Sequence, residues 1–254
     1  MIQRLFSRGI ILKLITLMGI FLLFDAGTVL WWSRDLPDPS NIQGETVNES
    51  TKIYDSTGKH LLYEIGEAKR TYVKLQEMSQ YMTKATLAAE DDQFYNHSGI
   101  SLSGLLRGTI LKPLTGQRAQ GGSTITQQLI KNSILSPERT IQRKVKEAVL
   151  AIELEQRFSK DEILEMYLNS IPYGSRSYGV EAAAQTFFGK SSRDLNLAQA
   201  ATLAALVQAP TRYSPYGSHT EDLKNRQEYI IDRMGDLGMI PKEEVERAKK
   251  EELQ

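Results

Sequence analysis

Three consecutive acids, Glu90, Asp91 and Asp92, directly follow the apolar run that ends at Ala89. Carboxylates in such a cluster can serve as general bases, ligate a metal ion, or lie in a solvated turn. Desolvation by the apolar neighbours and repulsion from the adjacent acids would both raise the pKa of Glu90, which strengthens it as a base. Taken alone, the cluster is more typical of an exposed turn, so the choice depends on the rest of the chain.

His97 lies seven positions after Glu90, about two helical turns, so a helix would place both on one face. A metal site usually needs three or four ligands, and a second acid–histidine pair is missing. The other histidines, His60 and His219, lie in unrelated segments. We therefore expect His97 to have a structural role that braces the turn at Gly99.

Residues 116–132 contain a second candidate site. The pair Gly121-Gly122 precedes Ser123 and Thr124, and the Thr124-x-x-Gln127 spacing matches a capping box, which predicts a helix start. A helix N-terminus with free N–H groups attracts anions. The density of polar side chains exceeds what a cap needs, and it favours a binding loop over an ordinary capped helix: Ser123, Thr124, Thr126, Gln127, Gln128 and Lys131.

The chain has 31 basic and 31 acidic residues, so its overall charge gives no reason to expect a nucleic-acid partner. Residues 104–146 nevertheless contain a single acid, Glu138, against eight basic residues: Arg107, Lys112, Arg118, Lys131, Arg139, Arg143, Lys144 and Lys146. This local excess indicates either an anionic partner or a solvated basic face. Glu147 is spaced to pair with Arg143 and Lys144 on a helix, either as surface ion pairs or as a carboxylate held among phosphate-binding cations.

The N-terminus predicts a membrane anchor. Arg4, Arg8 and Lys13 precede residues 14–32, a largely apolar stretch of 19 residues with Asp25 as its single acid. That length is close to the ~20 residues needed to span a bilayer as a helix, and the charge asymmetry places the N-terminus in the cytoplasm. A cleaved signal peptide is the alternative, but the sequence lacks a clear A-x-A cleavage site.

Beyond the anchor, residues 35–52 are rich in proline, glycine and polar side chains and are typical of a linker. A hairpin is predicted around the turn at residues 56–58. The remainder is mainly α-helical, and in residues 140–158 the helical spacing gathers Ile141, Val145, Ala148, Val149 and Ile152 on one apolar face. Helices are expected at 75–91, 140–158, 160–171, 179–189, 196–209, 223–239 and 240–254. The absence of cysteine excludes disulfides and a cysteine nucleophile.

Five segments together resemble the peptidoglycan glycosyltransferase family, the polymerising domain of class A penicillin-binding proteins and of monofunctional transglycosylases. They are AAEDDQFYNHSGI, GGSTITQQLIKN, RKVKEAVLAIELE, ILEMYLNSIPYGSRSYGVEAAAQTFFGK and NRQEYIIDRM. The resemblance covers residues 53–250, with two departures, Ser98 where a second histidine is frequent and Ser101 where an aspartate is frequent. These departures concern substrate fit near Gly99.

The resemblance implies a mainly α, lysozyme-like helical domain at residues 53–250, behind a cytoplasmic tip and transmembrane helix at residues 1–34. A small membrane-associated jaw would lie at residues 100–120. The implied reaction polymerises lipid II into β-1,4 glycan strands with inversion and releases undecaprenyl pyrophosphate. The implied location is the bacterial cytoplasmic membrane, in a single-pass protein with its catalytic domain outside. Its partners would be lipid II, the nascent glycan chain, the bilayer and other cell-wall synthesis proteins, with no nucleic acid.

Residue by residue, the resemblance makes Glu90 the general base and Glu147 the second carboxylate, which either orients cations or holds Mg²⁺ or Mn²⁺. It assigns substrate binding to Ser123, Thr124, Gln127, Gln128, Lys131, Asn132, Arg139, Lys144 and Arg226. Two alternatives remain: a lytic, hydrolytic lysozyme-like enzyme, and an inactive, truncated membrane scaffold of a bifunctional penicillin-binding protein. A hydrolase has no pyrophosphate to bind, so it would leave the basic segment unexplained.

Overall fold

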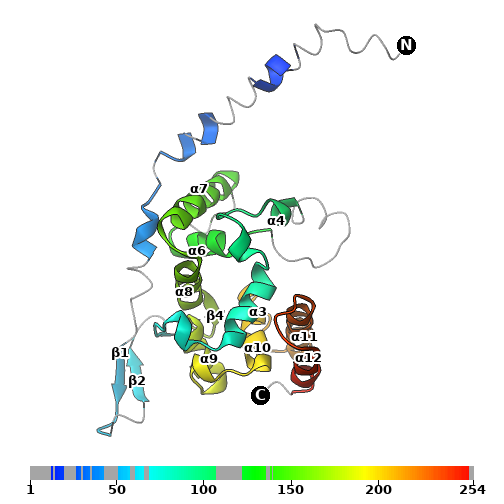
Figure 1. Ribbon diagram of the computed structural model, residues 1–254. Coiled ribbons are helices and arrows are strands. Elements are labelled where there is room, and N and C mark those ends of the chain that lie inside the picture. The colour runs from blue at the N-terminus through cyan, green and yellow to red at the C-terminus, as the bar shows by residue number, and fades with distance from the viewer. Residues whose placement is uncertain are drawn as a thin grey trace.

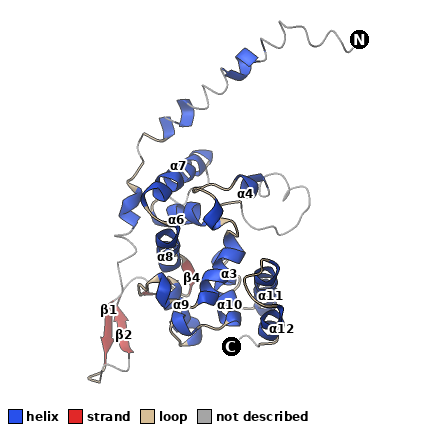
Figure 2. Cartoon of the chain, in the orientation of Figure 1, coloured by secondary structure: helices blue, strands red, loops and turns tan. Residues whose placement is uncertain are grey.

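The computed structural model is mainly helical, as the sequence predicts (Figures 1 and 2). It describes residues 13, 15–19, 27–29, 31–34, 36–42, 51–57, 61–65, 69–106, 122–135, 138 and 140–251. The longer helices are α3 (Gln80–Glu90), α6 (Ile125–Ser133), α7 (Ile141–Arg157), α8 (Lys160–Ser170), α9 (Val180–Phe188), α10 (Leu197–Gln208), α11 (Thr220–Asp236) and α12 (Lys242–Lys249). Each lies within or close to a predicted helix. Short 3₁₀ helices occur at η2 (Pro39–Asn41), η3 (Leu75–Glu77), η4 (Phe94–Asn96) and η6 (Ser192–Asp194).

The predicted hairpin is confirmed: β1 (Thr51–Tyr54) pairs antiparallel with β2 (Leu61–Ile65), and it projects away from the helical body (Figure 1). A second, three-stranded sheet has the order β3-β5-β4, in which β5 (Ser177–Tyr178) lies parallel to β3 (Lys69–Arg70) and antiparallel to β4 (Pro172–Gly174). Its strands have two or three residues each, too few for an alternating pattern to reveal them.

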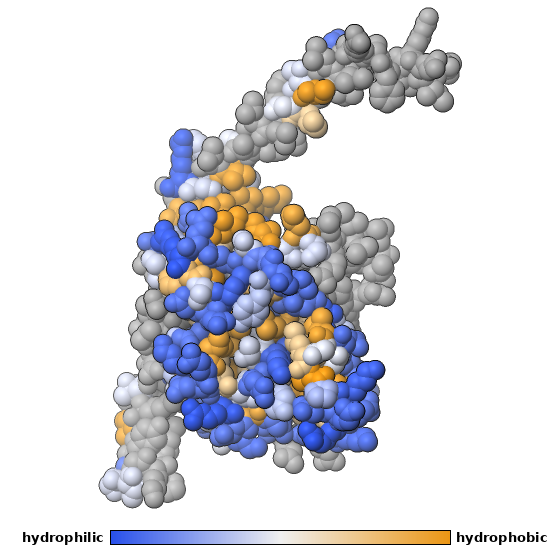
Figure 3. Space-filling model, viewed as in Figure 1, coloured by the Kyte–Doolittle hydropathy of each residue, from blue (hydrophilic) through white to orange (hydrophobic). Residues whose placement is uncertain are grey.

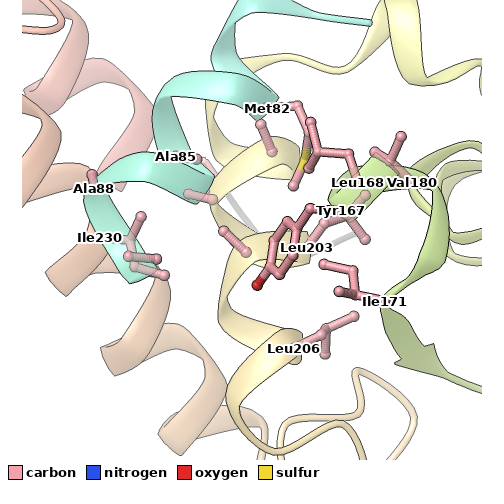
Figure 4. Packing of buried hydrophobic residues seen from close by; sticks show 14 of the residues in the cluster. Met82, Ala85, Ala88, Tyr167, Leu168, Ile171, Val180, Leu203, Leu206 and Ile230 are labelled. Atoms are coloured by element: carbon pink, nitrogen blue, oxygen red, sulfur yellow. The ribbon is translucent and has the colours of Figure 1, made fainter. Parts of the chain in front are cut away.

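Helix α10 forms the centre of the core. It is apolar on all sides, and such a helix must be buried on all sides; accordingly, nine of its twelve residues are buried. It packs against α3 and α11. Figure 4 shows Leu203 of α10 beside Tyr167 of α8, with Ala85 of α3 nearby and Leu206 further along α10. Asn196 and Gln199 form a capping box that fixes the start of α10.

Helix α7 has two apolar faces. The predicted face is on the outside: Ile141 is 79% exposed and Ile152 is 38% exposed. The opposite face packs inward through Leu150, Ala151 and Leu154, and it includes the buried Glu147. Hydrophobic side chains gather at the end of the body that α7 occupies (Figure 3). Apolar spacing therefore predicted the helix correctly but did not show which face joins the core.

Part of the predicted linker is packed against the helical body. η2 contacts α7, Asp38 forms an ion pair with Arg157 at 2.6 Å, and the side chain of Ile42 is fully buried. Nine of the 19 residues of the predicted membrane span, residues 14–32, lie outside the described residues. Among the residues that are described, the structure contains no helix long and apolar enough to cross a bilayer.

The predicted jaw, residues 100–120, is described only as far as residue 106. This part contains the short helix α4 (Leu102–Leu106), and Leu102 is 73% exposed. The Oγ of Ser101 accepts a hydrogen bond from the backbone nitrogen of Gly104 at 3.1 Å, which places Ser101 at the N-cap of α4. Serine and aspartate are both favourable N-caps, so this departure preserves the local structure. Ser98 is exposed.

Candidate active site

Glu90 is the last residue of α3 and is partly buried. Its Oε2 accepts a hydrogen bond from Nε2 of Gln128 at 2.7 Å. Burial raises the pKa of Glu90, and the charge of Asp91 adds to this, whereas the Gln128 hydrogen bond and the cations Arg226 and Lys131 act in the opposite direction. Burial is the largest of these effects, so Glu90 has the raised proton affinity that suits a general base.

The two neighbouring acids are structural. Oδ2 of the buried Asp91 accepts a hydrogen bond from the backbone nitrogen of Ile125 at 3.1 Å and lies 2.9 Å from Nε2 of His97. Asp92 pairs with Arg233 of α11. His97 therefore braces the Asp91 carboxylate, and its expected role at the turn of Gly99 stays a prediction. Among the described residues, no group of three acidic, histidine or cysteine side chains could hold a metal ion.

The start of α6 is the predicted capping box. The Oγ1 of Thr124 accepts a hydrogen bond from the backbone nitrogen of Gln127 at 3.2 Å. In return, the Oε1 of Gln127 accepts a hydrogen bond from the backbone nitrogen of Thr124 at 3.1 Å. The Thr124 hydroxyl also donates to the carbonyl oxygen of Gly99 at 2.7 Å. Both side chains are buried. Thr124 and Gln127, two of the predicted substrate-binding residues, therefore each use their side-chain oxygen to hold this loop.

Glu147 is only 1% exposed, and it lies among cations. Arg143 donates to its Oε1, and Nζ of Lys144 donates to its Oε2 at 2.8 Å. Lys144 also donates to Oγ of Ser123 at 2.7 Å, which links α7 to the loop before α6. Burial lowers the pKa of Lys144, and the nearby charges of Arg143 and Lys131 add to this. The geometry selects the second sequence interpretation, a buried carboxylate that organises two cations.

A cleft of about 810 Å³ opens between α6 and α7. Among the described residues, its lining contains three cations and two large apolar side chains but no acid: Lys131, Asn132, Leu135, Thr140, Ile141, Arg143 and Lys144. This surface suits a ligand that is both anionic and apolar. Arg139, a predicted substrate-binding residue, lies outside the described residues, as do Arg107, Lys112 and Arg118.

Helix α6 connects the candidate base to this cleft. Gln128 contacts Glu90, and Lys131, one turn later, lines the cleft. Arg226, on α11, lies on the Glu90 side, where its charge lowers the pKa of that carboxyl, and its guanidinium lies 5.0 Å from the ring centre of Tyr229. The structure therefore brings the predicted residues together in two adjoining parts, one around Glu90 and one around Lys131 and Lys144.

Sequence reasoning missed three residues near the site. Arg143 was counted in the basic segment and as a partner of Glu147, but its spacing did not show that it lines the cleft. The buried residues Tyr167 and Tyr173 lie close enough to Glu90 for its charge to raise their pKa further, after burial as the main cause. A tyrosine in the sequence indicates only that its hydroxyl needs a partner when it is buried, not which partner it has.

A family model described as Transglycosylase matches residues 58–235. The chain belongs to the transglycosylase family. Penicillin-binding protein 1A of Aquifex aeolicus is 44% identical over 215 residues, covering 85% of this chain and 29% of the relative. Penicillin-binding protein 1A of Escherichia coli is 39% identical over 236 residues, covering 91% and 28%. A solved structure of penicillin-binding protein 1A from Haemophilus influenzae is 29% identical, with a TM-score of 0.45, over 81% of this chain and 21% of its own.

This transglycosylase chain spans less than a third of the length of these curated relatives. The family match includes Glu90, the capping loop of α6, Glu147 and Arg226. It therefore covers both parts of the candidate site.

Proposed function

We propose that this transglycosylase chain is a peptidoglycan glycosyltransferase that polymerises lipid II into β-1,4 glycan strands in bacterial cell-wall synthesis. The observation that carries the proposal is the cleft with its three cations, connected through α6 to a carboxylate of raised pKa. Lipid II combines an acceptor hydroxyl that needs a base with a lipid pyrophosphate that needs cations and apolar contacts. The two parts of the site match these two needs.

In the proposed reaction, Glu90 removes the proton from the 4-hydroxyl of the acceptor sugar as that oxygen attacks C1 of the donor. The new C1–O bond forms on the face opposite the leaving group, so the α-linked donor gives a β-linked product with inversion. The bond from C1 to the pyrophosphate oxygen breaks, and the lipid pyrophosphate leaves as an anion. Lys131, Arg143 and Lys144 neutralise its charge, with Arg139 as a further predicted contact.

Glu147 supports this step by holding Arg143 and Lys144 at the cleft. Both of its oxygens accept hydrogen bonds from these cations, so a divalent ion at Glu147 would have to displace them. The arrangement offers that ion one carboxylate where such sites generally provide several oxygen ligands. Glu147 therefore does not fit a metal site in this arrangement, and the use of Mg²⁺ or Mn²⁺ stays a prediction, tested by polymerisation with and without EDTA.

The alternatives account for less of the site. A lytic enzyme with the same lysozyme-like arrangement would act on finished strands, whose cleavage does not release a pyrophosphate. The cationic lining of the cleft would then have no ligand. An inactive scaffold would have no need for a base that is partly buried and hydrogen-bonded by Gln128.

We extend the proposal to the membrane. Residues 14–32 would anchor the chain once in the cytoplasmic membrane, with the catalytic domain outside. The outward apolar face of α7, which includes the exposed Ile141, would lie against the lipid. This position would put the cleft at the level from which a lipid-linked substrate enters. A jaw at residues 100–120 and contacts with other cell-wall synthesis proteins stay predictions.

The test is incubation of the full chain with labelled lipid II in detergent. We expect a polymeric glycan product from the wild type and from Glu246→Gln, a control at an exposed position on α12. Glu90→Gln should give no polymer. Release of fragments from finished strands, with no polymer formed from lipid II, would show that the lytic alternative is correct.

A further inference from the structure

Two buried tyrosines lie near Glu90, and only one of their hydroxyls has a hydrogen-bond partner among the described residues. Tyr167 on α8 and Tyr173 on β4 are both fully buried. The hydroxyl of Tyr167 donates a hydrogen bond to Oε1 of Gln128 at 3.1 Å. The hydroxyl of Tyr173 has no hydrogen-bond partner among the described residues. Figure 4 shows Tyr167 among apolar side chains of α3, α8 and α10. The Gln128 contact thus provides a polar partner for a hydroxyl in apolar surroundings.

The contacts with Glu90 and Tyr167 together set and hold the orientation of the Gln128 amide. A glutamine side chain has one accepting end and one donating end. The Glu90 carboxylate can only accept, so the donating Nε2 faces its Oε2, at 2.7 Å. The Tyr167 hydroxyl donates to Oε1 at the other side of the amide and holds the amide in this position. The reversed amide would place its oxygen against the carboxylate and leave that carboxylate without its donor. Such a loss is costly for a partly buried charge.

The amide orientation in turn distinguishes the two oxygens of Glu90. Oε2 is bound by Gln128, whereas no hydrogen bond reaches Oε1 from the part of the chain that the structure describes. We propose that Tyr167 is a positioning residue: by fixing the Gln128 amide, it holds Glu90 so that Oε1 receives the acceptor proton. The assignment of Oε1 as the proton acceptor rests on the proposed function. The hydrogen-bond chain from Tyr167 through Gln128 to Glu90, called the lock below, does not rest on it.

The other groups that face Glu90 do not depend on the Tyr167 hydroxyl. They are Asp91 next in the chain, Lys131 on α6, Arg226 on α11, and the neutral Tyr173 on β4. Tyr167→Phe keeps the buried ring and these charges but frees the Gln128 amide to rotate. The hydrogen bond that lowers the pKa of Glu90 is then formed only part of the time. The pKa should rise by about 0.5–1 unit, the size expected from one such bond.

The experiment titrates Glu90 in the full chain in detergent, without substrate. Difference infrared spectra against Glu90→Gln isolate the Glu90 carboxyl in the wild type, Tyr167→Phe and the matched control Tyr173→Phe. We expect a raised pKa in Tyr167→Phe only, because only that variant removes a hydrogen bond to Gln128. An unchanged pKa in Tyr167→Phe, or the same shift in both variants, would overturn the proposal.

A double-mutant cycle tests whether Tyr167 acts through Gln128. Gln128→Met removes the amide and should itself raise the pKa of Glu90, which tests the lock even if Tyr167→Phe folds poorly. In the Gln128→Met background, Tyr167→Phe should produce no further shift. A shift of full size in both backgrounds would show that Tyr167 acts by another route.

Polymerisation of lipid II gives the second readout. The acidic limb of its pH profile should move to higher pH in Tyr167→Phe, with KM unchanged, and should stay in place in Tyr173→Phe. A movement of the limb in Tyr173→Phe, or none in Tyr167→Phe, would contradict the proposal. A wild type that titrates as expected but does not polymerise lipid II would refute the proposed function and leave the lock established.

Discussion

Oδ2 of Asp91 lies 3.1 Å from the backbone nitrogen of Ile125, the first residue of α6. The residue that follows the proposed base therefore binds the beginning of the helix that carries Gln128 and Lys131. Together with the Gln128–Glu90 hydrogen bond, this contact holds the C-terminal end of α3 against the N-terminal end of α6. It explains how Glu90 and the cleft keep their relative position although 34 residues separate the two ends in sequence.

Asp91→Ala should reduce the free energy of unfolding by about 1–3 kcal/mol, because it leaves a buried N–H donor unsatisfied. The control is Asp236→Ala, which removes an exposed carboxylate at the end of α11 and should change stability by no more than about 0.5 kcal/mol. Thermal unfolding of both variants in the same detergent measures the difference. Equal stability of the two would show that the Asp91 contact contributes nothing.

Much of this site could be predicted from local sequence. Helical spacing predicted the helices, the Thr124-x-x-Gln127 spacing predicted the cap, and the five family segments located Glu90 and Glu147. The role of Asp91 could not be predicted, because its partner is 34 residues away and a run of three acids gives no indication of which one is buried. The β3-β5-β4 sheet was missed because its strands are too short to show a period.

The orientation of α7 could not be predicted for a different reason. Apolar residues lie on both sides of this helix. The inner side also includes Glu147, a residue type whose hydropathy predicts exposure to solvent. The burial of Glu147 becomes acceptable only when Arg143 and Lys144 are placed beside it. Which of the two apolar faces joins the core therefore depends on the packing of α6 and α8, and this information is absent from α7 itself.

The raised pKa of Glu90 predicts the acidic limb of activity. A general base works only when deprotonated, so polymerisation should decline as the pH falls through the pKa of Glu90. Since burial raises that pKa, the midpoint of this limb in kcat/KM should lie above 4.5, the ordinary value for glutamate. A pH series with labelled lipid II measures it. A limb at or below the ordinary value would contradict a desolvated base.

The raised pKa of Glu90 also affects stability, and there it is unfavourable at neutral pH. The folded state holds the Glu90 proton more tightly than the unfolded state does, so the stability contributed by that proton is complete below about pH 4.5 and is lost as the pH rises through the folded-state pKa. At neutral pH the ionised carboxylate costs stability, and the inactive Glu90→Gln should unfold at a higher temperature than the wild type. Unfolding measured from pH 4 to pH 8 should show this advantage growing with pH. An advantage that is constant across the range would have another cause.

The cleft cations should be needed for turnover because the leaving group is an anion. Lys131→Ala and Lys144→Ala should each lower kcat by about 10²-fold, the usual effect of removing one group that stabilises developing negative charge. Lys190→Ala provides the control, since Lys190 is exposed in the turn after α9, outside the cleft lining. Steady-state rates with lipid II measure all three. Equal rates for the three variants would refute charge neutralisation by the cleft.

Gly99 should resist substitution more than another glycine of similar backbone conformation. Gly99 has φ +85°, and a Cβ there would lie 2.8 Å from the carbonyl oxygen of Ala151 in α7. Gly238 has φ +67°, but a Cβ there would meet nothing within 4 Å. Gly238→Ala therefore carries the left-handed backbone cost alone, about 1–2 kcal/mol. Gly99→Ala adds a clash with backbone that cannot yield without moving α7 away from the loop held by Thr124.

The loss of unfolding free energy in Gly99→Ala should therefore exceed the loss in Gly238→Ala. The polymerisation rate should fall in Gly99→Ala and be retained in Gly238→Ala. Equal destabilisation of the two variants would show that α7 and the Gly99 turn are not in close contact.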